Sequence, residues 1–592
     1  MIEQRFGPLI TDEGVRFRLW APGAAEVELV IEDARHRLWP SGDGFFEVTV
    51  PEAGPGTRYR FRRDGGPALP DPASRWQPKG VHGPSEVLEL PRPRATGWRG
   101  RPPGELVIYE LHVGTFTDEG GYRGVADRLD HLAGLGVTAV ELMPLAAFPG
   151  GRGWGYDGVF HFAPFPGYGR PRELLALVDA CHERGIAVIL DLVTNHFGPE
   201  GNSMWSLAPG FFRPDRPTSW SAGHAWHLDP VMRYFDEAAL HWIRAYGMDG
   251  LRLDAFHAVP AEVRGEHLGR MVRIVDEHLS AEEPGREVLV LLESIDNQAT
   301  LLCAGTTRVN VAQLNFDFQR SAHALLTGER HGEYRDFGEP ERELGRCLEE
   351  GFAFRGRWNS HSGRVIGDGG KPVRWGQLVN YLQNHDTCGN RHLGQRLDVL
   401  SAGGLEAATA LLLLHPAIPF LFMGQEWGAK TPFHFFTDFP DALGEATQSG
   451  RLRLFRELGP GPWEVQAPGC QEPDAFARSV LRWEELDRPD HRKVLDRVRE
   501  ALAVRRQVIG QMGLDVSGVE LRRIGACFLL RIPAREPDAP PFLLCANLGD
   551  APVDRPPGEL LFATRQCDDK VIPAATTCLL RVPRVRSGPA PG

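Results

Sequence analysis

Three carboxylates, each placed directly after an apolar run, are the candidate catalytic residues of this chain. Asp254 lies in GLRLDAFHAV, Glu293 in VLVLLESID and Asp386 in LVNYLQNHDTCGNR. The apolar runs have β-propensity, so each carboxylate is expected at the carboxyl end of a buried strand. A nucleophilic carboxylate, a carboxylic acid and a second aspartate at one barrel mouth predict cleavage of a glycosidic bond.

Asp254 and Glu293 are the natural reactive pair, because their strands are the fourth and fifth of the predicted set. Hydrolysis with retention needs a nucleophile and an acid about 5–5.5 Å apart. Arg252 shares the strand face of Asp254 and is predicted to keep it ionised. Glu293 follows leucines and valines, and a dry setting would raise its pKa, as a general acid requires. In a competing interpretation, each carboxylate only caps a strand or pairs with a surface arginine. That interpretation is reasonable for any single carboxylate but is disfavoured for all three at consistent strand ends.

Three histidines form a second layer of candidates: His196 in LDLVTNHFG, His257 in LDAFHAV, and His385 beside Asp386. A single histidine is usually a structural residue. Three at predicted strand ends are expected to donate hydrogen bonds to sugar hydroxyls. Metal ligation is a third alternative, but the chain has no HExxH spacing and no Cys/His cluster.

The Gly-rich segment GGRGWGYDG (150–158) offers two aromatic side chains, Trp154 and Tyr156, after the second predicted strand. Flat aromatic rings in this position are predicted to stack on a pyranose face. For Trp154, buried packing is an equally good interpretation.

The central part of the chain, residues 105–510, must position these groups. It contains eight apolar strand candidates separated by amphipathic helical patterns such as RELLALVDACHERG and YRGVADRLDHLAGLG. The alternation predicts a (β/α)8 TIM barrel; the alternative, an open doubly wound sheet, lacks its Gly-rich phosphate loop. The strand candidates are LVIYELHV, VTAVELMP, IAVILDLV, DGLRLDA, VLVLLES, VAQLNF, LVNYLQN and IPFLFMG.

Two β-rich regions flank the predicted barrel. Residues 1–92 contain short alternating strands (VRFRLWAP, EVELVIE, GFFEVTV, RYRFRRDG) and predict an immunoglobulin-like β-sandwich. Residues 91–104 are rich in Pro and Arg and predict a linker. A helix is predicted at about 490–506. Residues 515–585, which follow it, predict a small C-terminal β-sandwich domain and then a disordered tail. The predicted strands of this domain are VELRRI, CFLLRIP, FLLCANL, LLFATR and TCLLRVP. The fold class is therefore multidomain α/β.

Composition narrows the class of partner. The formal net charge of −12 over 592 residues disfavours nucleic acid and anionic membranes and suits a neutral ligand. Nine cysteines without a CxxC pair, and a start without a secretory signal pattern, predict a cytoplasmic protein. The longest apolar run, about 408–423, is too short and too interrupted by proline to cross a membrane.

Together the motif segments resemble the α-amylase superfamily of glycoside hydrolases. The stretches that carry the resemblance are DLVTNH (191–196), GLRLDAFHA (250–258), LLES (291–294) and QNHDTCGNR (383–391). Their order, and their places on the third, fourth, fifth and seventh predicted strands, also agree with that superfamily.

The resemblance implies a role for each matched residue. Asp254 would be the nucleophile, Glu293 the general acid/base, and Asp386 the residue that holds sugar hydroxyls and favours ring distortion. Arg252, His196 and His385 would complete the cleavage subsite, and Tyr156 would stack on its sugar. No cofactor is implied. Some members of the superfamily bind Ca²⁺ near the position of Asn195, but no dense carboxylate loop is present there, so no metal is predicted.

Within the superfamily, further segments are most similar to a subgroup that cleaves the α-1,4 bond next to the terminal trehalose unit of maltooligosyltrehalose. They include PDPASRWQP, MPLAAFPG and TPFHFFTDF, and His257 also fits this subgroup. The substrate implied is maltooligosyltrehalose or a related α-glucan. The alternatives are a glycogen- or starch-debranching or branching enzyme, and a catalytically inactive glucan-binding protein on the same scaffold. Residues 203–229 and the sequence ESIDN depart from the expected pattern and border the cleft.

Overall fold

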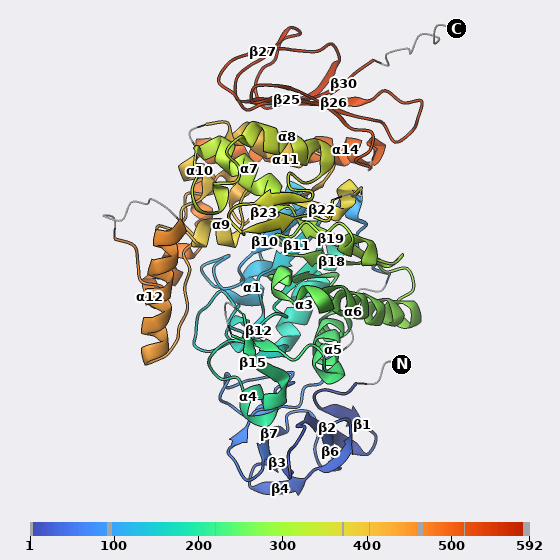
Figure 1. Cartoon of the computed structure of the whole chain (residues 1–592), viewed down its shortest axis with the longest axis vertical. Helices are drawn as coiled ribbons and strands as arrows, with labels where there is room; N and C mark the ends of the chain where they lie inside the picture. Colours follow the sequence, from blue (N-terminus) through green and yellow to red (C-terminus); the bar gives the residue numbers. More distant parts are fainter. Residues whose placement is uncertain are drawn as a thin grey trace.

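Two β-rich modules lie at opposite ends of a central barrel, along the long axis of the molecule (Figure 1). The computed structural model describes residues 4–91, 97–218, 221–369, 372–401, 403–458, 466–513 and 515–583. Part of the predicted linker (92–96), the last two residues of the predicted C-terminal domain (584–585) and the predicted disordered tail after 585 lie outside the described residues.

The central unit is a closed barrel of eight parallel strands. The ring closes where the first strand pairs with the last, with Ile108 opposite Phe420. Closure confirms the predicted TIM barrel and excludes the open doubly wound sheet. Each predicted segment matches one barrel strand, although the sixth strand begins at Val309, two residues before its predicted segment VAQLNF. Nearly every strand residue is buried, as expected for a parallel sheet covered by helices. The strands are β10 (Ile108–Leu111), β11 (Ala139–Leu142), β14 (Ala187–Leu192), β17 (Gly250–Leu253), β18 (Val288–Leu292), β19 (Val309–Leu314), β22 (Leu378–Tyr381) and β23 (Ile418–Phe422).

Amphipathic helices surround the barrel. One prediction needs correction: the single helical pattern YRGVADRLDHLAGLG forms two short helices, α1 (Gly121–Ala126) and α2 (Leu129–Leu135). The helix is interrupted at Arg128, whose guanidinium lies over the ring of Trp483, 4.3 Å from the ring centroid. The other main helices are α3 (Pro171–Glu183), α5 (Asp229–Tyr246), α6 (Ala261–Glu282), α7 (Phe316–Thr327), α8 (Pro340–Glu350), α11 (Leu405–Leu414), α12 (Asp441–Leu458) and α14 (Pro489–Val508).

The N-terminal module is a sandwich of two antiparallel sheets, in the orders β1-β2-β6-β5 and β4-β3-β7-β8. Its core includes the buried side chains of Val15, Phe17, Leu29 and Phe61. The four predicted strands became β2 (Gly14–Trp20), β3 (Val27–Ile31), β6 (Phe45–Val50) and β7 (Arg58–Arg63). The short outer strands were not predicted, because they are brief and show little apolar alternation. They are β1 (Leu9–Thr11), β4 (Ala34–Arg37), β5 (Trp39–Gly42), β8 (Ala68–Leu69) and β9 (Ser85–Glu86).

The C-terminal module is built on one five-stranded antiparallel sheet, and its second layer is only the two-stranded ribbon of β27 (Val553–Asp554) and β29 (Val571–Ile572). The sheet packs on α8 and α11 of the barrel unit. Its strands are β24 (Glu520–Ile524), β25 (Cys527–Ile532), β26 (Phe542–Asn547), β30 (Thr576–Arg581) and β28 (Glu559–Ala563). Among the helices of the described residues, none has both the length and the apolar character needed to cross a membrane.

Candidate active site

The three predicted carboxylates lie beyond the carboxyl ends of barrel strands. Asp254 follows β17 and Glu293 follows β18, and these strands pair in parallel with Leu253 opposite Leu292. The two carboxylates are therefore level with each other on neighbouring strands. Asp386 lies in the first turn of the short helix α9 (His385–Gly389), after β22. The seventh-strand aspartate is thus placed by a helix turn rather than by the strand itself.

A single guanidinium group links the reactive pair. Arg252 Nη2 is 3.0 Å from Glu293 Oε2, and Arg252 Nη1 is 3.7 Å from Asp254 Oδ1. Nη1 also forms an ion pair with Asp191, which projects from β14. The Arg252 side chain is 1% exposed. In this low-dielectric position its charge acts strongly on every carboxylate around it.

The electrostatics of the pair reverse the prediction made from sequence. Burial, and then the charge of Glu293, raise the pKa of Asp254 well above its usual range. Burial also acts to raise the pKa of Glu293, but Arg252 and the Ala255 N–H outweigh it and lower that pKa. The physical reason is that Arg252 approaches Glu293 more closely than Asp254. Protonation is therefore easier at Asp254 than at Glu293.

Local backbone geometry fixes both carboxylates. Ala255 adopts a left-handed conformation with φ of 38°, and its N–H donates to Glu293 Oε2 at 2.7 Å. The side-chain amide of Asn195 donates to Asp254 Oδ2 at 2.8 Å. A non-glycine residue in this conformation is strained and persists only where surrounding contacts enforce it. The strain here places a hydrogen-bond donor between the two reactive groups.

Tyr156 joins several site residues through its hydroxyl group. The O–H donates to Asp191 Oδ2 at 2.6 Å and accepts from Arg252 Nη1 at 3.1 Å. His385 Nε2 is 2.8 Å from the same oxygen, and His385 Nδ1 hydrogen-bonds Glu110. Burial acts to lower the pKa of His385, but Glu110 and Asp386 outweigh it and raise the pKa to about 9. His385 is therefore a cation that donates from both ring nitrogens.

Asp386 is the most accessible of the three carboxylates. Its side chain is 39% exposed, against 10% for Asp254 and 9% for Glu293. Asn390 Nδ2 donates to Asp386 Oδ1 at 3.0 Å, and Arg451 Nη2 donates to Asn390 Oδ1 at 2.6 Å. Arg451 comes from α12, which stands beside the barrel in Figure 1. Asp386 is thus free to meet a ligand while a second residue holds its orientation.

Trp154 is buried, and this favours the packing interpretation over sugar stacking. The residue is 3% exposed, its ring stacks on Phe433, and its indole Nε1 donates to the carbonyl of His434 at 2.9 Å. Its edge meets the ring of His385. Trp154 therefore supports the site from behind, whereas Tyr156 remains partly exposed.

The remaining predicted histidines contact protein groups in the site. His196 Nε2 lies 2.9 Å from the Tyr156 carbonyl, and His196 Nδ1 lies 2.6 Å from Asn195 Oδ1. The ring of His257 hydrogen-bonds the backbone of Glu293, and burial lowers the pKa of His257. In the substrate-free structure these rings hold the loops that carry Asp254, Tyr156 and Glu293.

Five contributing residues were given no role in the predicted site: Glu110, Asp191, Asn195, Asn390 and Arg451. Asp191 and Asn195 lie inside the DLVTNH segment, and Glu110 lies in the first predicted strand, so strand-end position could have found them. Arg451 had no such signal because α12 lies outside the barrel pattern. Within the described ranges, no group of three or more His, Cys, Asp or Glu side chains could hold a metal ion.

Comparison with known proteins supports this arrangement. Residues 93–206 match the family model of the alpha amylase catalytic domain, and residues 5–72 match that of carbohydrate-binding module 48, the isoamylase N-terminal domain. A solved structure titled as a putative alpha amylase from Salmonella typhimurium superposes with a TM-score of 0.91 at 35% identity, covering 98% of this chain and 100% of that one. These matches agree with the barrel and the N-terminal sandwich.

Curated relatives indicate which family within the α-amylase superfamily this chain belongs to. The malto-oligosyltrehalose trehalohydrolase of Arthrobacter ramosus is 41% identical over 513 residues, covering 83% of this chain and 87% of that protein. The enzyme of the same name from Brevibacterium helvolum is 34% identical over 572 residues, covering 93% of this chain and 95% of that protein. On this evidence the chain belongs to the malto-oligosyltrehalose trehalohydrolase family, a group of glycoside hydrolases within the α-amylase superfamily.

Proposed function

We propose that this protein hydrolyses the α-1,4 bond next to the terminal trehalose unit of maltooligosyltrehalose, releasing trehalose and a shortened maltooligosaccharide. The names of the relatives and the segments shared with the trehalose-releasing subgroup support the substrate. The single observation that carries the chemistry is the pair Asp254 and Glu293, level on neighbouring strands and joined by Arg252. This is an arrangement suited to displacement at an anomeric carbon.

The reaction proceeds by double displacement with retention. The Asp254 carboxylate attacks the anomeric carbon while Glu293 gives its proton to the leaving glycosidic oxygen, which departs as the trehalose hydroxyl. Glu293, now ionised, takes a proton from water. The resulting hydroxide equivalent attacks the glycosyl-Asp254 ester, restoring the Asp254 carboxylate and the proton on Glu293. One water is consumed and one glycosidic bond is broken.

The protonation preference of the pair must reverse before the first step. In the free site Asp254 has the raised pKa and Glu293 the lowered one, which is the opposite of what the reaction uses. A bound glycosidic oxygen accepts a hydrogen bond from a protonated Glu293, and this favours the neutral form of that carboxyl. Asn195 donates to Asp254 Oδ2 and favours the ionised form of that aspartate. Substrate binding would therefore favour the neutral form of Glu293, while the Asn195 hydrogen bond supports the ionised form of Asp254.

Asp386 binds hydroxyl groups of the reacting sugar, because it is the exposed carboxylate of the three and is held in orientation by Asn390. Tyr156 presents the partly exposed ring beside it, stacked on the other side against His385. The hydrogen bonds that sugar hydroxyls donate to a carboxylate strengthen as the ring distorts toward the transition state. Asp386 and Tyr156 thus position the sugar, and Asp254 and Glu293 react with it.

Product analysis tests the proposal. The full-length protein is incubated separately with maltooligosyltrehalose, the matching linear maltooligosaccharide and a branched glucan, and NMR records the products and their initial anomeric form. We expect free trehalose from the first substrate, an α-anomeric reducing end, and little action on the other two. Preferential attack on the linear or branched glucan would overturn the substrate. A β-anomeric first product would overturn the double displacement.

A further inference from the structure

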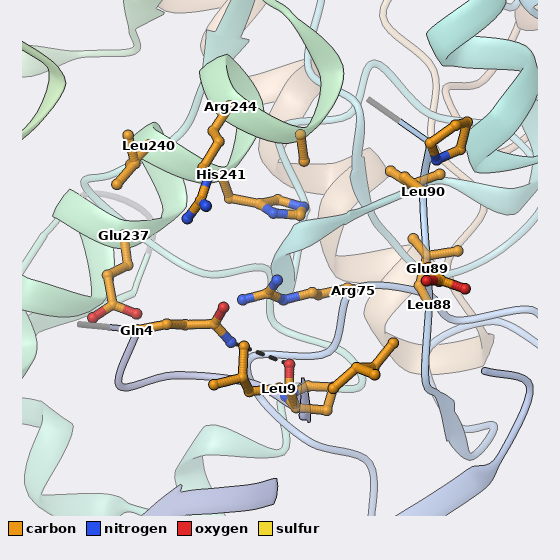
Figure 2. Close-up of a pocket in the computed structure, with 14 residues that line it drawn as sticks. Gln4, Leu9, Arg75, Leu88, Glu89, Leu90, Glu237, Leu240, His241 and Arg244 are labelled. Atoms are coloured by element: carbon orange, nitrogen blue, oxygen red, sulfur yellow. Dashed lines mark hydrogen bonds between the residues drawn. The ribbon is translucent and has the colours of Figure 1, made fainter. Parts of the chain in front are cut away.

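A cavity of about 440 Å³ lies between the N-terminal module and helix α5, away from the barrel mouth. None of the active-site residues described above lines it. Its walls come from the start of the chain, from the segment around Arg75, from residues 88–91 and from α5. Figure 2 shows three basic side chains, Arg75, His241 and Arg244, directed into the same space. The volume is within the range of about 300–1,000 Å³ that is usual for small-molecule sites.

Arg75 faces this cavity without an ion pair to any described residue. Its Nη2 donates to the Phe6 carbonyl at 3.3 Å, whereas its buried Nε has no hydrogen-bond partner in the part of the chain that the structure describes. Glu237, the carboxylate with the strongest electrostatic influence on Arg75, forms no ion pair with it. Its oxygens instead accept from the Arg5 and Phe6 N–H groups and from Arg233. A shielded guanidinium without an ion pair is costly, and a bound anion would remove that cost.

Arg244 adds a second positive charge from α5. Its guanidinium points toward Arg75 and His241 in Figure 2. Its ion pair with Glu282 is long, at 3.6 Å, and half exposed to solvent, so it constrains the side chain weakly. Glu89, the other carboxylate of the lining, lies on the opposite wall. Two guanidinium groups at one side of a cavity form a site for a phosphate or carboxylate group.

His241 supplies a different kind of polar group. The residue is 8% exposed, and one ring nitrogen hydrogen-bonds the backbone of Phe162. Its Nε2 is buried and has no partner among the described residues. Burial, and then the charge of Arg75, hold the pKa of His241 well below its usual range, so the ring is neutral. A neutral ring that donates from one nitrogen accepts at the other, and a ligand hydroxyl group is the matching donor.

Most of the remaining lining is apolar, and Gln4 is a further polar group. The apolar side chains can cover the faces of a sugar ring, whose C–H groups are apolar while its hydroxyls point outward. They include Leu9, Leu88, Leu90 and Leu240.

We propose that this cavity binds a hexose monophosphate, with the phosphate on Arg75 and Arg244 and a sugar hydroxyl donating to His241 Nε2. The ligand joins the N-terminal module to α5. This helix leads through residues 247–249 into β17, the strand that carries Arg252. The site is independent of the proposed hydrolysis, because it shares no residue with the barrel mouth.

Calorimetric titration of the full-length protein tests the assignment. The probes are glucose 6-phosphate, glucose, gluconate and inorganic phosphate, each used alone. We expect glucose 6-phosphate to bind most tightly. Arg75→Met and Arg244→Met should each weaken its binding about tenfold or more, the loss expected for one charge-assisted contact. His241→Phe should weaken glucose 6-phosphate but not inorganic phosphate. Arg172→Gln, at an exposed arginine of α3, removes the same charge elsewhere and should leave binding unchanged.

Each other outcome contradicts the proposal. Equal binding of glucose and glucose 6-phosphate would overturn the phosphate contact. Equal binding of inorganic phosphate would overturn the sugar contact, and tighter binding of gluconate would replace the phosphate by a carboxylate. Absence of binding, or binding insensitive to both Arg75→Met and Arg244→Met, would overturn the site itself. Circular dichroism and unchanged trehalose release by Arg75→Met in phosphate-free buffer establish that the variant is folded.

Discussion

Arg252 and Arg75 are two shielded guanidinium groups in opposite electrostatic surroundings. Arg252 stands among the carboxylates of Glu293, Asp191 and Asp254, and their charges outweigh burial and raise its pKa. Arg75 has no ion pair within the described residues, and burial lowers its pKa. The first charge is already used to organise the protein's own groups. The second is available for a ligand.

The difference between the paired Arg252 and the unpaired Arg75 indicates which charge can contribute free energy to binding a ligand. Removing one member of a buried charge network leaves its partners unpaired, whereas removing an unpaired charge leaves nothing behind. Mutations in the buried charge network around Arg252 should therefore damage both chemistry and stability. Mutations in the α5 cavity should change ligand binding alone. The following predictions test that contrast, from the largest expected effect to the smallest.

Asp254→Ala should abolish turnover of every α-glucan, with kcat reduced by about 10⁴-fold or more because no nucleophile remains. Steady-state rates on maltooligosyltrehalose measure the loss, and Arg172→Gln serves as the matched folded control. A rate near that of the unmodified protein would remove Asp254 from the mechanism.

Glu293→Gln should reduce kcat by about 10²–10⁴-fold on the natural substrate but much less on a glycosyl fluoride, whose leaving group needs no proton. The charge of Glu293 raises the pKa of Asp254, so its removal lowers that pKa. The acidic limb of the pH profile for the fluoride should therefore move to lower pH. Equal losses on both substrates, or an acidic limb that moves upward, would contradict the assigned role.

Arg252→Met should destabilise the protein by about 3–5 kcal/mol, because several buried carboxylates lose their common partner. Arg252 lowers the pKa of both Asp254 and Glu293. Without it both pKa values rise, and the acidic limb of kcat/KM should move to higher pH. Urea unfolding and a pH profile measure the two effects. A variant as stable as the parent would show that the carboxylates do not depend on Arg252.

Arg451→Gln should lower kcat/KM by about tenfold, because Asn390 loses the donor that orients it toward Asp386. A positioning role predicts that Arg451→Lys, which keeps a donor, recovers part of the loss. The unfolding midpoint should change little. Loss of stability in step with loss of activity would instead make Arg451 a structural residue of α12.

Arg75→Met should change the unfolding free energy by no more than about 1 kcal/mol in phosphate-free buffer, because no ion pair is broken. At the same concentration, added glucose 6-phosphate should raise the unfolding midpoint of the parent more than that of the variant. A loss comparable to that of Arg252→Met would show that Arg75 is already paired, and the contrast between the two arginines would fail.

Much of the fold was predictable because apolar runs and helix-stop glycines recur at the spacing of β-α units. Seven of the eight barrel strands fall within the predicted segments, and the sixth, β19, begins two residues before its segment. The strand ends indicated Asp254 and Glu293. The directions of the pKa shifts of Asp254 and Glu293 could not be predicted from the sequence. Whether Arg252 favours Asp254 or Glu293 depends on a difference between 3.7 Å and 3.0 Å, which follows from packing across four strands.

The burial of individual side chains was the second feature that could not be predicted from the sequence. Trp154 and Tyr156 lie two residues apart on the same loop, yet one is covered by Phe433 and the other stays partly exposed. The covering ring comes from a segment almost 280 residues later in the chain, so nearby residues carry no signal of it. Arg451 escaped prediction for the same reason.

The position of Arg252 also makes hydrolysis depend on the correct pairing register of the barrel strands. In the observed register Arg252 lies opposite Asp191 on one side and Leu291 on the other. Because side chains alternate between the two faces of a strand, a slip of β17 by one residue would turn the guanidinium out into the helical layer. A compact but misaligned barrel would thus be inactive. Recovery of hydrolysis during refolding therefore reports correct strand alignment, which spectroscopic signals of secondary structure do not distinguish.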